Sequence, residues 1–155
     1  MQFVENNKFL VFCIVVSILI LALLVVNIVA VVYNGKSVAA PEIPRDKITI
    51  GGGEELQYLI LGDSTSISQG SKYEEGFAVH TAEELAKKYK VTYQNFGVSG
   101  ARVADVLNEQ IPKSKEFMPD VVLIAIGAND VTHVTSKSEI KKNLESIIVE
   151  LRRDN

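Results

Sequence analysis

The chain has 155 residues and a formal net charge of −3, with no long run of like charge. The length suits one domain, and the mild acidity argues against nucleic acid as a partner. Its one cysteine, Cys13, lies in an apolar stretch, so an intrachain disulfide is excluded.

Residues 9–33 carry no charged side chain and are rich in Val, Leu and Ile. About 20 apolar residues of helix span the hydrocarbon core of a bilayer, so this stretch predicts one transmembrane helix after a short tail, residues 1–8. The alternative is a cleaved signal peptide, because residues 38–40 resemble a small-residue cleavage site. The apolar run is longer than the roughly 7–15 residues usual in signal peptides, which favours an uncleaved anchor.

Residues 34–47 contain Pro41 and Pro44 without a periodic apolar pattern, which predicts a linker to a domain spanning residues 48–155. Residues 47–50 indicate a short strand, and the glycine triplet 51–53 indicates a turn. No Lys-Ser or Lys-Thr pair follows the triplet, so a phosphate-binding loop is not favoured.

The apolar run Tyr58–Leu61 stops at Gly62, and Asp63 and Ser64 follow at once. This pattern predicts a buried strand and then a sharp turn. A hydroxyl at the carboxyl end of a buried strand lies where open α/β sheets bind their ligands. Taken alone, Gly-Asp-Ser is also the composition of an ordinary turn.

Helices and strands alternate in the rest of the chain, which predicts right-handed βαβ units on a parallel sheet. The predicted strands are residues 91–96 and 120–126, and the second is an apolar run typical of a strand covered on both faces. The predicted helices are residues 74–90, residues 102–110 ending near Pro112, and a helix capped by Ser136 and Glu139 with Ile140, Leu144, Ile147, Ile148 and Leu151 facing inward.

Three short motifs each close one of these strands: GDS at 62–64, NFGVSG at 95–100 and GAND at 127–130. In this order they resemble blocks one, two and three of the SGNH hydrolases, also called the GDSL esterase family. The resemblance covers roughly residues 56–153. It implies a three-layer α/β sandwich with a parallel, flavodoxin-like sheet in the strand order two-one-three, and neither metal nor cofactor.

The resemblance also implies roles for particular residues. Ser64 becomes the nucleophile, and the oxyanion hole comes from the backbone amides of Ser64 and Gly100 and the side-chain amide of Asn129. These residue types suit the chemistry, because glycine lets backbone approach a substrate closely and asparagine offers a neutral donor. Read singly, Gly100 fits a turn glycine and Asn129 an Asx turn. Asp63 and Asp130 are expected to orient the loops by accepting backbone N–H bonds.

The chain departs from the family at its carboxyl end. The family takes its catalytic Asp and His from an Asp-x-x-His block after further strand and helix, whereas this chain reaches Asn155 directly after the helix of the third block. Of the two histidines, His80 is expected to be structural or exposed, and His133 lies near enough to Asn129 to be a candidate base. We interpret the chain as the amino-terminal part of such a hydrolase, with its third strand left as an open edge.

Two functions follow as hypotheses. The first is a single-pass membrane-anchored serine esterase, with its domain outside the cytoplasm, acting on small-molecule, lipid or glycan esters and inactive in this form. The second is a non-catalytic remnant or module that binds an acyl or sugar group. An Asp-x-x-His motif downstream in the source gene, or labelling of Ser64 by a fluorophosphonate, would favour the first.

Overall fold

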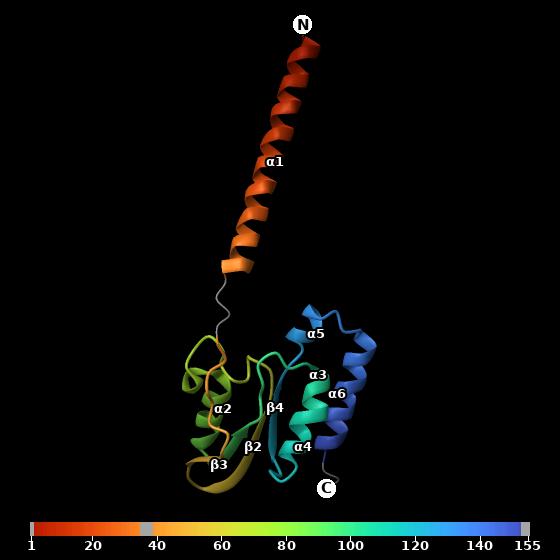
Figure 1. Cartoon of the computed structure of the whole chain (residues 1–155). Coiled ribbons are helices and arrows are strands. Elements are labelled where there is room, and N and C mark those ends of the chain that lie inside the picture. Colours follow the sequence, from red (N-terminus) through yellow and green to blue (C-terminus); the bar gives the residue numbers. More distant parts are fainter. Residues whose placement is uncertain (1, 35–38, 153–155) are drawn as a thin grey trace. The chain divides into compact units, whose positions relative to one another are not determined.

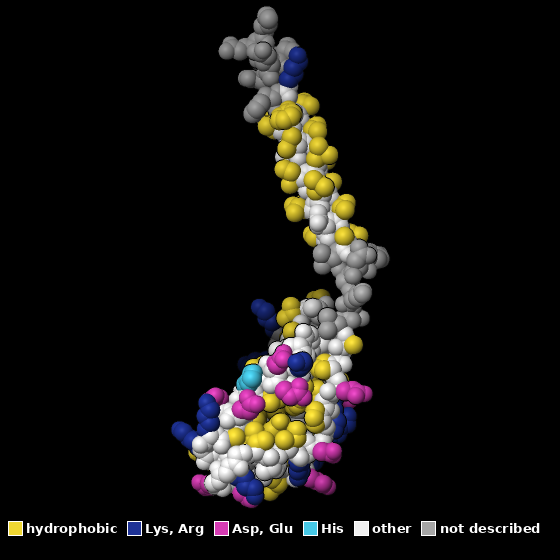
Figure 2. Space-filling model, turned by 90° about the vertical axis from the view of Figure 1, so that its left-hand side faces the viewer, with side chains coloured by type: hydrophobic (Ala, Val, Ile, Leu, Met, Phe, Trp, Pro, Cys, Tyr) yellow, Lys and Arg dark blue, Asp and Glu magenta, His cyan; other side chains and the backbone are white. Residues whose placement is uncertain are grey.

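The computed structural model describes residues 2–34 and 39–152 and divides into two units, Met1–Ser37 and Val38–Asn155 (Figure 1). The first unit is the helix α1 (Gln2–Asn34), whose hydrophobic side chains follow one another along its length in Figure 2. Its segment Leu10–Ala30 is long and apolar enough to cross a membrane, a property that signal sequences near an amino terminus share.

The second unit is built on a four-stranded sheet in the order β1-β3-β2-β4. Its strands are β1 (Ile48–Gly51), β2 (Glu54–Gly62), β3 (Tyr89–Asn95) and β4 (Val121–Ala125). The parallel pairs β2–β3 and β2–β4 confirm the predicted order two-one-three.

The short strand predicted at residues 47–50 is β1, but it runs antiparallel to β3 at the outer edge of a sheet that was expected to be parallel. Only Gly52 and Gly53 lie between β1 and β2, too few for the crossover of about a dozen residues that two parallel strands of one sheet need. Gly51 has a φ of +77°, and a Cβ there would lie 2.4 Å from the Tyr89 carbonyl oxygen. The triplet therefore serves as the predicted turn and passes closely beside the start of β3.

Strand β2 is the centre of the domain and is buried on both faces. Tyr58 and Ile60 pack with the helix α2 (Phe77–Ala86) on one face. Leu59 and Leu61 pack on the other face. There the chain runs through α3 (Val103–Asp105), the π-helical turn η2 (Val106–Gln110), α4 (Ile111–Ser114) and α6 (Lys137–Leu151). Helices on both faces make the three layers that the alternating pattern predicts (Figure 1).

The helix predicted over residues 74–90 is shorter in the structure. A 3₁₀ turn η1 (Tyr73–Glu75) precedes it, and Gly76 between the two has an extended conformation. A Cβ at Gly76 would lie 1.5 Å from the Ser68 hydroxyl, so the chain packs here through bare backbone. Tyr89, expected on the helix, instead begins β3.

The helix predicted to end near Pro112 continues to Ser114. In the π turn the N–H of Ile111 donates to the carbonyl of Val106, five residues earlier. Pro112 then falls in the first turn of α4, where a missing N–H costs little. The π turn therefore lets the chain pass a proline that would end an ordinary helix.

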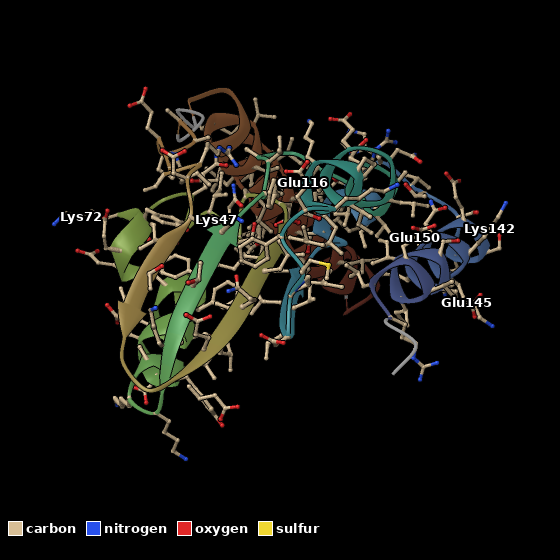
Figure 3. The ribbon with its side chains drawn as sticks, turned by 90° about the horizontal axis from the view of Figure 1, so that it is seen from below. Lys47, Lys72, Glu116, Lys142, Glu145 and Glu150 are labelled. Atoms are coloured by element: carbon tan, nitrogen blue, oxygen red, sulfur yellow. The ribbon has the colours of Figure 1, made fainter. Side chains whose placement is uncertain are left out.

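The last helix has its predicted cap, because the Ser136 hydroxyl accepts the Glu139 N–H at 3.2 Å. Ile147 is fully buried, whereas Ile148 is 53% exposed, so its predicted inward position is wrong. One residue turns a helix by about 100°, which carries Ile148 out of the apolar stripe. Figure 3 shows Lys142 and Glu145 projecting outward from the same helix.

Strand β4 forms the second edge of the described sheet. Its side chains are only partly covered, because Val121 is 38% and Ile124 is 37% exposed. Val122 packs with the core on one face and Leu123 with the core on the other, as predicted, and the exposure comes from the open edge that was also predicted. Its apolar run matches that of a buried strand, but β4 has a neighbour on one side only in the part that the structure describes.

Candidate active site

The first motif closes β2 at a point where two other strand ends approach. Gly62 has a φ of +150°, and a Cβ there would lie 2.1 Å from the Ala125 carbonyl oxygen at the end of β4. That same oxygen accepts the N–H of Asp63 at 3.0 Å, and the Gly62 carbonyl accepts the N–H of Val98 at 3.0 Å. The first motif is thus fixed between the loops that carry the other two.

Ser64 lies half-buried in the turn that follows. The carboxylate of Asp63, itself only 2% exposed, accepts the N–H of Thr65 at 2.9 Å. Asp63 thus shapes the turn as predicted. No partner for the Ser64 hydroxyl or the Ser64 N–H is found among residues 2–34 and 39–152, so both groups are free to meet a bound molecule.

The second motif is tied to the first by the side chain of Asn95. Its Nδ2 donates to the Ser66 carbonyl at 2.8 Å, and its Oδ1 accepts the N–H of Gly97 at 2.8 Å. Gly100, further along, is exposed and has a φ of +82°, which favours glycine. Within the described residues, nothing accepts the Gly100 N–H.

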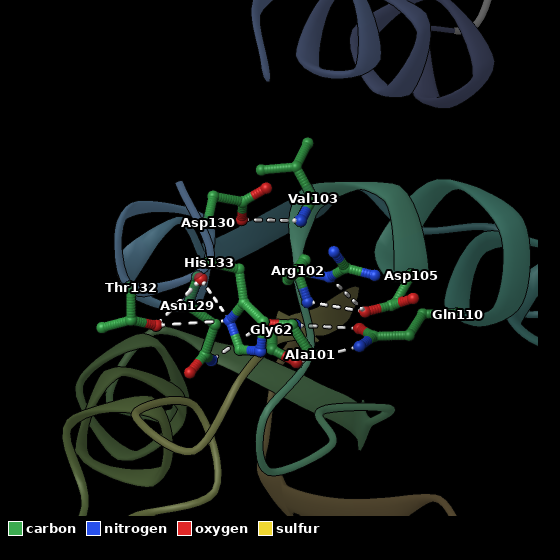
Figure 4. A network of polar contacts seen from close by, with 10 residues as sticks. All are labelled: Gly62, Ala101, Arg102, Val103, Asp105, Gln110, Asn129, Asp130, Thr132 and His133. Atoms are coloured by element: carbon green, nitrogen blue, oxygen red, sulfur yellow. Dashed lines mark hydrogen bonds and ion pairs between the residues drawn. The ribbon is translucent and has the colours of Figure 1, made fainter. Parts of the chain in front are cut away.

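The third motif lies on the short helix α5 (Ala128–Thr132) and is tied to the second. Asn129 donates through Nδ2 to the Ala101 carbonyl at 2.9 Å, and the buried Asp130 accepts the N–H of Val103 at 3.0 Å (Figure 4). Asp130 therefore orients a loop, as predicted. The bond to Ala101 uses one of the two N–H groups of the Asn129 amide and leaves the second for another acceptor.

The three motifs thus lie at the carboxyl-end edge of the parallel strands, but they border different hollows. Ser64 lines a hollow of about 350 Å³ with Thr65 and Gln69, and Gly100 lines another of about 240 Å³ beside Gln110. Among the described residues, no group of His, Cys, Asp or Glu gathers to hold a metal ion.

Neither described histidine pairs with Ser64. His80 is exposed and lies 2.8 Å from Glu83, and the Nδ1 of His133 lies 2.8 Å from the Asn129 carbonyl. Residues 130–133, Asp-Val-Thr-His, have the Asp-x-x-His spacing within the third motif and its helix. In the structure Asp130 is directed at Val103 and His133 at Asn129, so the two side chains do not form an Asp–His pair (Figure 4).

Gln110 holds the first motif in place, although no motif or periodicity along the chain points to it. It is 2% exposed, and its amide makes two bonds to the backbone of Gly62. Oε1 accepts the Gly62 N–H at 2.9 Å, and Nε2 donates to the Gly62 carbonyl at 2.9 Å (Figure 4). The partners lie 48 residues apart in the chain, so no local pattern signals the contact.

Solved structures of esterases share this fold. The chain is 27% identical to TesA with a TM-score of 0.58, covering 62% of this chain and 54% of TesA. It is 26% identical to the psychrotrophic esterase EstA from Pseudoalteromonas sp. (TM-score 0.53, covering 61% and 52%), and 27% identical to AlinE4, an SGNH-hydrolase family esterase (TM-score 0.54, covering 65% and 55%). The chain therefore spans about half the length of each.

No curated protein sequence matches the chain. The model of the GDSL-like lipase/acylhydrolase family matches residues 60–155, which is more than half of the chain and includes all three motifs. The sequence motifs, the sheet order and the likeness to esterase structures agree with that match. The chain belongs to the GDSL-like lipase/acylhydrolase family.

Proposed function

We propose that the protein is a serine esterase that cleaves carboxylic esters through Ser64. The observation that carries the proposal is the set of unpaired hydrogen-bonding groups at one sheet edge: the Ser64 hydroxyl and N–H and the Gly100 N–H have no partner among the described residues. Unpaired donors on loops fixed by Asn95 and Asn129 are what an oxyanion hole requires.

In the proposed reaction the Ser64 oxygen attacks the ester carbonyl carbon and loses its proton to a base. The negative charge that develops on the carbonyl oxygen is stabilised by the N–H groups of Ser64 and Gly100 and the second N–H of the Asn129 amide. The alcohol then leaves with a proton, and water hydrolyses the acyl-serine to release the acid. Asp63 and Asp130 keep the loops in place and transfer no proton.

The proposed reaction needs a base for Ser64. A serine hydroxyl is a weak nucleophile without an adjacent base, and no described side chain is hydrogen-bonded to the Ser64 hydroxyl. Loss of the catalytic histidine costs about 10⁶-fold in turnover in a serine protease, and the remaining groups still give about 10³–10⁴ over water. We therefore propose that the 155-residue chain turns over slowly.

Hydrolysis of p-nitrophenyl acetate tests this proposal. We expect slow turnover by the wild-type chain and the same slow rate for His133→Ala. Ser64→Ala should hydrolyse the ester no faster than buffer without protein. The wild-type rate should exceed that of Ser64→Ala, because only the former forms an acyl-enzyme. Equal rates in all three proteins would contradict the esterase proposal, whereas loss of a fast rate in both variants would make His133 the base.

A second candidate function is binding of an acyl or sugar group without cleavage. The unpartnered Ser64 hydroxyl favours it, because a hydroxyl without a base serves as a hydrogen-bonding group. In that case an unreactive amide analogue of an ester would bind at the hollow that Ser64 lines, while ester turnover stayed at the blank.

We further propose that α1 anchors the protein in a membrane, with the domain outside the cytoplasm and a small-molecule, lipid or glycan ester as substrate. The support is the apolar segment Leu10–Ala30. After carbonate extraction of expressing cells, the protein should stay with the membranes at its full-length mass. Release into the soluble fraction, or a mass lacking the first 40 or so residues as expected for signal cleavage, would overturn the anchor.

A further inference from the structure

The segment before β1, predicted as part of a linker, contacts the loops of the candidate site. Residues 35–38 lie outside the described part, and residues 39–47 have no helix or strand before Ile48. Ile43 is nonetheless 9% exposed, in a cluster with Ile67 of the Ser64 turn and with Tyr73. The segment is therefore packed on the domain at this point.

Arg45 makes the polar contacts of the same segment. One guanidinium nitrogen, Nη1, donates to the Asn95 carbonyl at 3.2 Å and to the Gly97 carbonyl at 3.0 Å. The Arg45 carbonyl in turn accepts from Nε2 of Gln94 at 2.6 Å. A charged donor shared by two carbonyls two residues apart fixes the curve of the backbone between them.

The backbone that Arg45 holds lies just before Gly100, the candidate oxyanion donor. Asn95 also holds the Ser66 carbonyl and reaches the Tyr73 hydroxyl at 3.3 Å, so Arg45 acts on the residue that joins the first two motifs. Burial raises the pKa of the Tyr73 phenol, which keeps that hydroxyl neutral. Gly100, with its free N–H, lies three residues beyond Gly97 in the same loop.

We propose that Arg45 is a positioning residue: it holds the loop of residues 95–101, which carries the Gly100 N–H, against the turn that carries Ser64. The role of Gly100 in this statement rests on the proposed esterase function. The segment of residues 39–47 then contributes to the site. A protein truncated at residue 47 would lack Arg45 and its two hydrogen bonds to the loop.

Hydrogen exchange of the full-length protein in detergent micelles tests the proposal. The variants are Arg45→Gln, Arg45→Lys and the control Lys88→Gln, which removes the same charge from an exposed position that has no contact with the site among the described residues. The informative amides are those of Phe96, Gly97, Val98 and Ala101, each of which donates a hydrogen bond within or beside the loop.

We expect Arg45→Gln to speed exchange in residues 96–101 by about 10-fold while β2 and α6 stay unchanged, because about one charge-assisted bond's stabilisation is lost locally. Arg45→Lys should fall between, since an ammonium donates to carbonyls without the fixed fork of arginine, and Lys88→Gln should match the wild type. Unchanged exchange in the loop, or a rise across all elements alike, would overturn the positioning role.

The rate at which a fluorophosphonate labels Ser64 is measured on the same proteins. Slower labelling of Arg45→Gln, with partial recovery in Arg45→Lys, supports the link from Arg45 to the site. Labelling at the wild-type rate despite faster loop exchange would overturn that link. Absence of labelling in every protein would contradict the esterase proposal, and loop exchange would still decide whether Arg45 holds the loop.

Discussion

The Gly62→Ala variant is expected to be severely destabilised. A Cβ at this position would lie 2.1 Å from the Ala125 carbonyl oxygen and 2.9 Å from its carbon, both of them backbone atoms of β4. A φ of +150° is also unfavourable for any residue with a side chain. Moving β4 away would break its pairing with the central strand, so we expect a loss of about 4 kcal/mol or more in the free energy of unfolding.

Urea unfolding measures this loss, and two other glycines serve as controls. Gly52→Ala should be nearly neutral, because a Cβ there meets nothing within 4 Å. Gly100→Ala should cost about 1–2 kcal/mol, from its φ of +82° alone, since the space around it is open. A stable Gly62→Ala protein with normal circular dichroism would show that the close approach of β2 and β4 at Gly62 is not essential.

The Gln110→Glu variant is expected to be unstable at neutral pH and to recover stability in acid. A protonated carboxyl offers the same donor and acceptor to Gly62 as the native amide does. When ionised, it accepts from the Gly62 N–H but places negative charge against the Gly62 carbonyl in a buried position. We expect the free energy of unfolding to fall by about 3 kcal/mol at pH 7.

The sign follows from the pKa of the introduced carboxyl. Burial and the facing carbonyl raise its folded-state pKa above the unfolded value of about 4.3. Its stabilising form is therefore fully present below the unfolded pKa and is lost as pH rises through the folded pKa. Urea unfolding of the variant and the wild type between pH 4 and 8 gives the difference, and Gln110→Leu should show a loss that does not vary with pH. A constant difference for Gln110→Glu would contradict the model of the Gly62 contact.

Local patterns in the sequence predicted the centre of this fold. The run Tyr58–Leu61 is apolar at every position because β2 is buried on both faces. Ser136 predicted the start of α6 because a helix cap is a contact between residues close in the sequence. The short strand at residues 47–50 and the open edge of the third strand were predictable, whereas the antiparallel direction of β1 was not, since a run of apolar residues has the same appearance in either direction. The predicted helix end near Pro112 was wrong because a π turn has no characteristic amino-acid composition from which it could be predicted.

For the candidate site, the motifs led to Ser64, Gly100 and Asn129 but not to the residues that hold them. Gln110 and Arg45 act on backbone atoms 48 to 52 residues away in the chain, and such contacts produce no spacing that can be read along the sequence. The orienting roles of Asp63 and Asp130 were predictable, because each carboxylate lies beside the polar residue of its own motif.

The most direct test of the proposed site is the rate of Ser64 labelling by a fluorophosphonate, followed by intact mass and peptide mapping. We predict slow addition of one group at Ser64, none in Ser64→Ala, and a rate about 10²–10³-fold lower in Asn129→Ala, because one oxyanion donor is lost. Thr132→Ala, one turn of α5 away, should label like the wild type. Labelling of Asn129→Ala at the wild-type rate, or addition at a residue other than Ser64, would contradict the proposal that Ser64 and Asn129 act in one site.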